Sequence, residues 1–461
     1  MTYEKMNFFA AQAWVDGAWA RDVLLKVGAD GRWSDVQTNT PSEDRSKATV
    51  LNGPLLPGLV NAHSHAFQRA MAGLTERRGD SPGAASDDFW SWRDRMYSVA
   101  RRVTPSQLEA IAAFLYAELL DAGYTQVCEF HYLHNAADGA PAADPLEMSL
   151  ALVRAAQTVG IGLTLLPTLY MRSGFSDAGL RADQSRFAST PASLLRLLES
   201  VRAQAAHLPE FNAGVALHSL RAADMAAIRE VCSHAAGAGL PIHIHIAEQT
   251  REVQDCIAAS GQRPIEHLLS NVALNAQWNL VHATHASPAE LQAVRESGAS
   301  IVICPSTEAN LGDGVFDFSG YANGTWAIGS DSHVTRSWTQ ELRLLEYSQR
   351  LTRRRRNVAA QTANCASSAA ALLQGALSGG SSASGRPLGA IRAGQRADFL
   401  VLDVQSAALL GVPDAQVLDA LVFSSPEARF TDVFVAGRRT MHDLRPQLAQ
   451  DFLRTMRALW N

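Results

Sequence analysis

The sequence predicts an α/β protein, namely a (β/α)8 TIM barrel with a small β-sandwich domain built from both chain ends. Eight apolar, strand-like runs alternate with segments of helical spacing over about 280 residues, which is typical of a parallel barrel. Shorter strand-like runs occupy both chain ends. The chain has 461 residues, 47% hydrophobic and 18% charged, so it can form one large core and a smaller domain.

The two chain ends share one pattern. Residues 8–51 alternate short apolar runs with turn signals such as Asp16-Gly17, which indicates a few antiparallel strands. Residues 389–403 and 428–439 show the same pattern near the other end. Neither stretch is long enough to enclose a core alone, so we expect the two ends to fold together.

This expectation divides the chain into two domains. Residues 1–56 and 386–461 are expected to form the small β domain, and residues 57–385 the barrel. The segment 379–385 (GGSSASG) is rich in glycine and serine, and we expect it to be a flexible connection between the two.

The barrel segment is defined by its periodicity. A doubly wound sheet also alternates strands and helices, but no glycine-rich phosphate-binding loop follows an early strand, so the barrel is favoured. The expected strands are residues 56–65, 125–132, 162–170, 213–219, 241–248, 279–284, 300–306 and 326–333. The expected helices include residues 106–122, 145–159, 193–206, 223–238, 287–297 and 338–353.

The overall charge points to a small-molecule partner. A net charge of −5 and a pI near 6.3 provide no field that would gather nucleic acid or an anionic membrane. The arginine run 353–356 is interpreted as a solvated helix end. No signal-like or membrane-spanning run is found, so we expect a cytoplasmic protein.

The five cysteines are scattered and never form a Cys-x-x-Cys pair. This argues against a disulfide framework and against a thiolate zinc site, so we expect reduced, mostly buried thiols.

Candidate metal ligands lie at the ends of the expected strands, where barrels of this kind place their catalytic residues. His63 and His65 end the first run, and their spacing of two directs both imidazoles to one side of a strand. His245 in the fifth run is the third candidate, while His243 is assigned to the barrel interior as a hydrogen-bonded core residue. Asp331 ends the eighth run and offers a carboxylate. Three imidazoles and a carboxylate suit zinc or another first-row divalent metal.

The neighbouring residues predict hydrolysis. Such a metal lowers the pKa of bound water from near 16 to about 7 and so produces hydroxide at neutral pH. Asp331 can take the proton of that water, Glu248 can carry a proton to the leaving atom, and His282 can polarise the group under attack. No lysine follows Lys47, which excludes a carbamylated lysine bridge between two metals. One metal ion per chain is therefore favoured.

These motifs resemble a known family. The pattern His63-x-His65, His245-x-x-Glu248, His282 and Ser330-Asp331 resembles the mononuclear deaminase branch of the amidohydrolase superfamily. The longer motifs resemble those of the N-formimino-L-glutamate deiminases of bacterial histidine degradation; they are VNAHSHAFQRAMAGL, CEFHYLH, LHSLRA, HIHIAEQ, LVHATH and STEANLGDG. The resemblance implies hydrolysis of N-formimino-L-glutamate to N-formyl-L-glutamate and ammonia, through attack of metal-bound hydroxide on the amidine carbon. It also implies zinc as the usual metal, and a homodimer.

Arginines near the strand ends suit an anionic substrate of this kind. Arg221 follows His218 by three residues, and Arg93 lies in the aromatic segment FWSWRDRMY. Arginine forks bind carboxylates through two parallel hydrogen bonds. The resemblance suggests that Gln68, Tyr132 and His218 complete the pocket. For Arg93 and Tyr132, ordinary loop packing is an equally good explanation.

Two other functions are open at this point. A nucleobase deaminase of the guanine or cytosine type would share the metal and the mechanism, and ammonia release from guanine or cytosine would identify it. A catalytically silent, ligand-binding barrel would bind metal without turning over any amidine or base. The presence of every predicted proton-transfer group argues against the second alternative.

Overall fold

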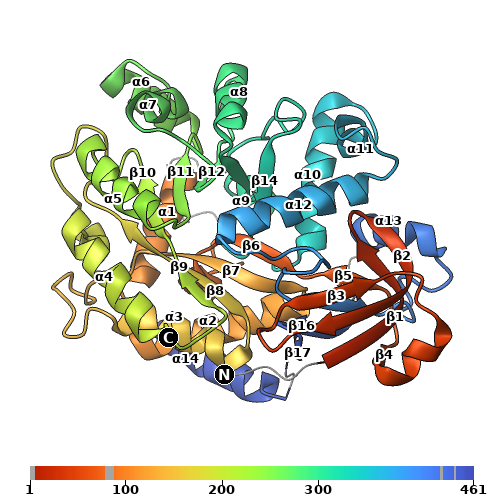
Figure 1. Cartoon of the computed structure of the whole chain (residues 1–461). Helices are drawn as coiled ribbons and strands as arrows, with labels where there is room; N and C mark the ends of the chain where they lie inside the picture. Colours follow the sequence, from red (N-terminus) through yellow and green to blue (C-terminus); the bar gives the residue numbers. More distant parts are fainter. Residues whose placement is uncertain (1–5, 78–87, 426–428, 441–442, 461) are drawn as a thin grey trace.

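The computed structural model describes residues 6–77, 88–425, 429–440 and 443–460, and these build a parallel barrel and a mixed sheet (Figure 1). The barrel strands follow one another in the order of the sequence, as predicted for a (β/α)8 barrel. They are β6 (Leu59–Ser64), β7 (Tyr124–His131), β8 (Gly162–Leu169), β10 (Val215–Ser219), β11 (Ile242–Ile246), β12 (Trp278–His282), β13 (Ser300–Ile303) and β14 (Thr325–Ile328). The short β9 (Phe211–Ala213) pairs with β8. Each expected strand-like run thus overlaps a barrel strand, although β7, β12 and β14 begin one residue before the expected runs.

The helices between these strands begin with strong sequence signals. Thr104 and Gln107 form a reciprocal capping box at the start of one helix, and Ser287 and Glu290 form another. In both helices proline stands at the first position, where its fixed backbone angle and missing N–H are tolerated. All six expected helices are present within three residues: α2 (Pro105–Asp121), α3 (Glu147–Val159), α4 (Pro191–Gln204), α5 (Met225–Gly237), α8 (Pro288–Ser297) and α10 (Trp338–Arg353). The others between Phe89 and Leu311 are α1 (Phe89–Ala100), α6 (Thr250–Ser260), α7 (Pro264–Asn271) and α9 (Pro305–Leu311).

The barrel closes where its last strand segment meets its first. The backbone N–H of Asp331 donates to the carbonyl of His63 at 3.0 Å, and the N–H of His65 donates to the carbonyl of Asp331 at 3.3 Å. These bonds form an isolated parallel bridge between Ser64 and Asp331. Gly329 is required beside this bridge, because a Cβ there would lie 2.6 Å from Cβ of His63. The closure therefore occurs at the C-terminal end of the strands.

Strands from both chain ends form one mixed sheet beside the barrel, as predicted, and the expected sandwich takes the form of a curled sheet. Its order is β17-β16-β15-β5-β1-β2-β3, with β4 paired to β1. Phe8, Trp33, Phe399 and Phe434 pack in the core that this sheet encloses. The bounds are β1 (Met6–Val15), β2 (Ala18–Val27), β3 (Trp33–Gln37), β4 (Thr49–Leu51), β5 (Leu55–Pro57), β15 (Phe399–Leu402), β16 (Phe430–Val435) and β17 (Arg438–Arg439).

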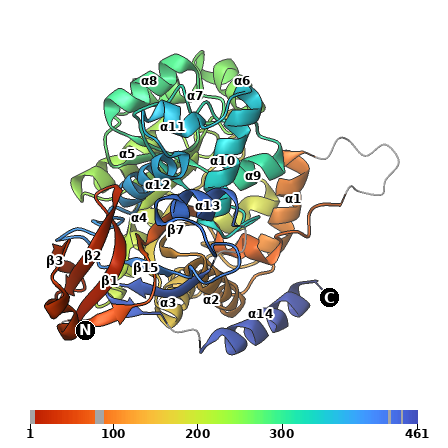
Figure 2. The same cartoon turned by 90° about the vertical axis from the view of Figure 1, so that its right-hand side faces the viewer.

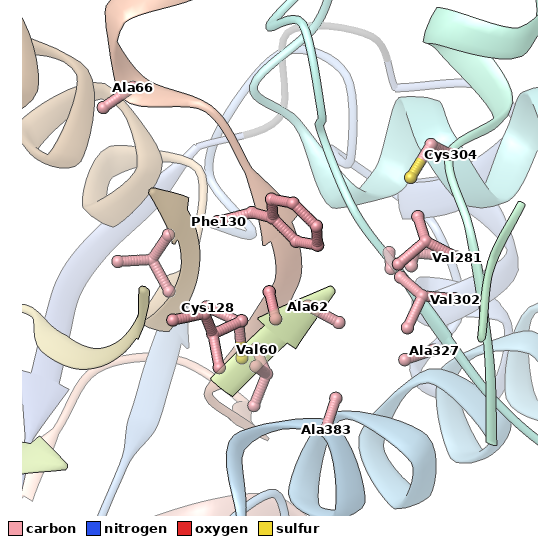
Figure 3. Packing of buried hydrophobic residues seen from close by; sticks show 14 of the residues in the cluster. Val60, Ala62, Ala66, Cys128, Phe130, Val281, Val302, Cys304, Ala327 and Ala383 are labelled. Carbon is pink, nitrogen blue, oxygen red and sulfur yellow. The ribbon is translucent and has the colours of Figure 1, made fainter. Parts of the chain in front are cut away.

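The expected flexible connection at residues 379–385 is wrong, because this segment is almost entirely helical. It forms the end of α12 (Ser368–Ser384), which packs against β14 and β6. A Cβ at Gly379 would lie 1.9 Å from the carbonyl oxygen of Trp326, so glycine here permits close helix packing. In Figure 3, Ala383 of this helix faces Val60 and Ala327 of the barrel. The segment is glycine-rich for packing, and the sequence alone does not distinguish this from flexibility.

The C-terminal helix α14 (Arg445–Trp460) packs against α2, and Figure 2 shows it along the outer edge of the molecule. Phe452 stacks on Phe114 with ring centroids 4.6 Å apart. The remaining short helices are α11 (Val358–Thr362) and α13 (Val417–Phe423).

Two further expectations concern the thiols and the membrane. All five cysteines are free, and four are buried, as predicted; Cys365 is exposed. Within the parts of the chain that the structure describes, no helix is both long and apolar enough to cross a membrane.

Candidate metal centre and active site

The four predicted metal ligands converge at the C-terminal end of the barrel. His63 lies in β6, His65 follows it, His245 lies in β11, and Asp331 follows β14. The Nε2 atoms of His63 and His245 are 2.9 Å apart. Oδ1 of Asp331 lies 3.4 Å from Nε2 of His63 and 3.5 Å from Nε2 of His65. All four side chains are buried. The ligand atoms of His63, His65 and Asp331 lie within 4.8 Å of one another, and so do those of His63, His245 and His282.

Two of these histidines are held by backbone carbonyls in the orientation that metal binding needs. Nδ1 of His65 lies 2.9 Å from the carbonyl oxygen of Phe130, and Nδ1 of His245 lies 2.9 Å from that of His218. A carbonyl oxygen only accepts hydrogen bonds, so Nδ1 carries the proton and Nε2 keeps its lone pair for a metal.

The protonation states also fit a metal site. Burial lowers the pKa of His63, His65 and His245, so these imidazoles are neutral at pH 7. Metal ligands must be deprotonated, and neutral imidazoles require no proton loss before binding. The cluster therefore fits a first-row divalent metal without rearrangement of its protons.

The predicted proton-transfer residues lie beside these ligands. Nε2 of His282, at the end of β12, lies 3.8 Å from Oε1 of Glu248 and 3.8 Å from Oδ2 of Asp331. Nδ1 of His282 lies 3.3 Å from Oε1 of Glu308. Burial alone would lower the pKa of His282, but the three carboxylates outweigh it and raise this pKa to about 10. Burial raises the pKa of the Glu248 carboxyl to about 7. A carboxyl group with a pKa near neutrality suits a proton carrier at that pH.

The backbone is strained where it presents these residues. His282 and Asp331 have φ of 70° and 46°, and Ala247, beside Glu248, has φ of 51°. This left-handed region is costly for residues other than glycine and occurs preferentially at functional sites. The turns redirect the chain at the ends of three barrel strands.

All five residues predicted to bind substrate line one cavity at the barrel mouth: Gln68, Arg93, Tyr132, His218 and Arg221. The same cavity is lined by His65, His245, Glu248, His282 and Asp331. His63 is fully buried and is not part of the cavity wall. Phe89, Trp92, Met96, Tyr97 and Leu311 complete the lining.

Within this cavity the polar groups of the predicted binding residues are incompletely paired. Nε2 of Gln68 donates to the Tyr132 hydroxyl at 3.3 Å, while Oε1 of Gln68 has no partner among the described residues. The Nε atoms of Arg93 and Arg221 are buried and lack hydrogen-bond partners within the same part of the chain. Burial lowers the pKa of His218, and the nearby Arg221 lowers it further, so His218 is neutral. Guanidinium groups bind carboxylates through parallel hydrogen bonds, so these two arginines suit an anionic ligand.

His243 lies below the cavity, as predicted. Its Nε2 lies 2.8 Å from the carbonyl oxygen of Ala383, which connects the barrel interior to α12. It is a buried, hydrogen-bonded core residue.

Two acidic residues of the site escaped the sequence analysis. Glu308 of α9 contacts His282 and also accepts the N–H of Cys304 at 2.8 Å. Glu252 accepts the N–H groups of Ala247 and Glu248 at 3.3 and 3.0 Å, and so holds the loop that carries Glu248. Glu308 follows the seventh strand-like run, so the strand-end rule would have found it. No comparable signal marks Glu252.

Comparisons with known proteins agree with this geometry. Residues 55–440 match the sequence model of the Amidohydrolase family. The chain is 45% identical to a formimidoylglutamate deiminase of Pseudomonas aeruginosa over 95% of each chain. The crystal structure of an amidohydrolase from Brucella melitensis has 41% identity and a TM-score of 0.92, covering 99% of this chain and 100% of that one. A zinc-bound adenosine deaminase from Xanthomonas campestris has 21% identity and a TM-score of 0.79, with 98% of each chain covered, and so shares the fold.

Proposed function

Because this chain belongs to the amidohydrolase family, we propose that it is a metal-dependent deiminase that hydrolyses N-formimino-L-glutamate to N-formyl-L-glutamate and ammonia in histidine degradation. The observation that carries the proposal is one cavity shared by the metal-ligand cluster, Glu248 and two arginines without carboxylate partners in the described residues. The deiminase of Pseudomonas aeruginosa supports the choice of substrate.

The cofactor in this proposal is one Zn2+ per chain, held by His63, His65, His245 and Asp331. Another first-row divalent metal would suit the same ligands. When bound, the metal supplies Lewis acidity that lowers the pKa of water at the site. No lysine occurs beyond Lys47, which supports a site for one metal ion.

The carboxylates and His282 move the protons in this proposal. Asp331 takes a proton from the attacking water, since its Oδ1 faces the ligand imidazoles and its Oδ2 faces His282. Glu248 carries a proton to the terminal nitrogen of the amidine, which then leaves as ammonia. His282 is cationic because of its acidic neighbours, and it stabilises negative charge that develops on the substrate.

The remaining cavity residues orient the substrate. Arg221 and Arg93 bind its carboxylates, while Gln68, Tyr132 and His218 contact the rest of the molecule. With the glutamyl part anchored, the terminal nitrogen points toward Glu248, so ammonia leaves and the glutamate nitrogen stays bonded.

We also propose a homodimeric assembly and a cytoplasmic location. The free, mostly buried cysteines agree with a reducing compartment. The division into a barrel of residues 57–385 and a small domain of residues 1–56 and 386–461 is part of the same proposal.

The test is a coupled ammonia assay with N-formimino-L-glutamate beside guanine, cytosine and N-formimino-L-aspartate. We expect ammonia from the first substrate and none from either base. Ammonia from guanine or cytosine alone would make the protein a nucleobase deaminase. Bound metal without turnover of any substrate would make it a silent, ligand-binding barrel.

The products provide a second test. Carbon NMR or mass spectrometry should detect N-formyl-L-glutamate as the only carbon-containing product. Formamide together with free glutamate would show that the opposite C–N bond is cut, and that the substrate lies in the reverse orientation.

A further inference from the structure

Helix α1 places an aromatic residue against one arginine of the cavity. The carboxylate of Asp88 accepts the N–H groups of Trp90 and Ser91 at 3.0 and 3.1 Å, which defines the first turn of the helix. Trp90 and Arg93 are three residues apart and so lie on the same side of the helix. The guanidinium carbon of Arg93 lies 4.5 Å from the centroid of the Trp90 ring.

Two more arginines approach the same indole from other segments. Arg221, in the loop after β10, lies 5.5 Å from the ring centroid, and Arg251, in the first turn of α6, lies 5.0 Å from it. Three guanidinium groups thus surround Trp90, and each is close enough for a cation–π contact.

These three arginines differ in their relation to the cavity. Arg93 and Arg221 line it, whereas Trp90 and Arg251 do not. Arg251 is exposed, with 66% of its side-chain surface accessible, and it pairs with Asp255 at 3.7 Å. Trp90 therefore contacts the two cavity-lining arginines without lining the cavity itself, and the exposed Arg251 contacts the same indole.

A contact with Trp90 would help to hold Arg93 and Arg221 close together. Arg93 and Arg221 are like charges in one cavity. Neither forms an ion pair with a residue that the structure describes, although the more distant carboxylates of Glu252 and Glu248 raise the pKa of Arg221. Repulsion between the two arginines favours conformations in which their guanidinium groups move apart. The negative face of an indole attracts both groups and opposes that separation.

We propose that Trp90 is a positioning residue that holds Arg93 and Arg221 together as a paired receptor for the two carboxylates of a dicarboxylate substrate. This inference rests on the proposed function, because it takes the two arginines as the groups that bind substrate. Trp90 acts through them and makes the enzyme selective for a substrate with two carboxylates.

The test compares Trp90→Leu and Trp90→Phe in the metal-loaded enzyme. The substrates are N-formimino-L-glutamate and N-formimino-4-aminobutyrate, which has one carboxylate. We expect Trp90→Leu to raise KM for the dicarboxylate about tenfold, which corresponds to about 1.4 kcal/mol, with the larger part of the loss in KM and not in kcat. Selectivity for the dicarboxylate should fall, and Trp90→Phe should restore part of it. An equal fall in kcat/KM for both substrates would overturn the proposal. A fall in kcat with unchanged KM would also overturn it.

Two control variants separate this role from a structural one. Arg251→Gln removes the outer cation and should change KM less than twofold; a tenfold rise would assign the effect to Arg251 instead. Trp19→Leu removes a partly buried indole of the small sheet, 5.2 Å from Trp14, and reports the cost of losing such a side chain elsewhere. If Trp19→Leu raises KM equally, Trp90 has no special role.

Binding of glutarate, measured by calorimetry on the zinc-loaded protein, distinguishes failure of this proposal from failure of the proposed function. If the wild type binds glutarate about tenfold more tightly than Trp90→Leu does, the role of Trp90 is supported even if formiminoglutamate is not hydrolysed. Turnover of formiminoglutamate with equal glutarate affinity, or with no glutarate binding in either protein, would overturn the role of Trp90 and leave the proposed function standing.

Discussion

Replacing Glu248 by glutamine tests the proton carrier with little change in shape. Glu248 is 6% exposed, its N–H donates to Glu252, and its Oε1 lies 3.8 Å from Nε2 of His282. Glutamine keeps the volume and a hydrogen-bonding oxygen, but it cannot carry a proton. Proton transfer by a positioned side chain contributes about 10² to 10⁴ in rate, and each factor of ten corresponds to about 1.36 kcal/mol. We therefore expect Glu248→Gln to lose about 3 to 5 kcal/mol of transition-state stabilisation.

The pH dependence carries further information. The pKa of Glu248 is raised to about 7, so its carboxylate form increases as the pH rises through 7. Because Glu248 donates a proton to the leaving nitrogen in the proposed mechanism, kcat/KM of the wild type should fall as the pH rises through this range, and the variant should lose that limb of the profile. The raised pKa also affects folding, because the stability that it contributes is present below about pH 4.5 and is lost as the pH rises through 7.

The assay is ammonia release from N-formimino-L-glutamate as a function of pH, with zinc content measured by elemental analysis. Glu230→Gln, on the exposed side of α5, removes the same charge away from the cavity and should leave kcat/KM unchanged. Full metal content with near-normal turnover in Glu248→Gln would remove this residue from the mechanism.

Three further predictions test other parts of the structure. His65→Ala or Asp331→Ala should lose both metal and activity, and elemental analysis should find about one metal ion per wild-type chain; two per active chain would contradict the mononuclear site. Arg221→Met should raise KM and lower kcat/KM by about 2 to 5 kcal/mol, because a desolvated carboxylate loses its charged partner; steady-state kinetics with an unchanged KM would place the substrate elsewhere. Gly379→Ala should destabilise the fold by about 3 kcal/mol in urea unfolding, since its Cβ would meet the Trp326 backbone. Gly237→Ala, at an open helical position, should instead stabilise by about 0.5 to 1 kcal/mol, and equal stability of the two variants would contradict the packing role of α12.

Much of the site was predictable because barrel strands carry their functional residues at one end. His63 and His65 are two residues apart, and His245, Glu248 and Asp331 lie at the ends of apolar runs. In a parallel barrel the ends of the strands meet at one mouth, so the fold class alone predicts that these residues lie together. The same rule applied to the seventh run would have found Glu308. The cavity lining also includes every predicted substrate-binding residue, although their roles in binding remain predictions.

The glycine-rich end of α12 shows where such reasoning fails. Composition made residues 379–385 look flexible, because glycine and serine are common in linkers. The same small residues also allow a helix to approach a strand closely, and Gly379 lies against the backbone of Trp326. The local composition around Gly379 holds no information about Trp326, which lies more than fifty positions away in the chain. The close packing of these two residues therefore could not be predicted from composition.

By itself, the sequence determined the alternation of strands and helices, the pairing of both chain ends in one sheet and the residues that end the barrel strands. These features follow from local periodicity and turn chemistry, which act over a few residues. Only the tertiary structure decided that the closing bridge runs through Ser64 and Asp331, that α12 packs against β14 and β6, and that three arginines surround Trp90. Such contacts join segments far apart in the chain, and their geometry depends on how the whole barrel closes.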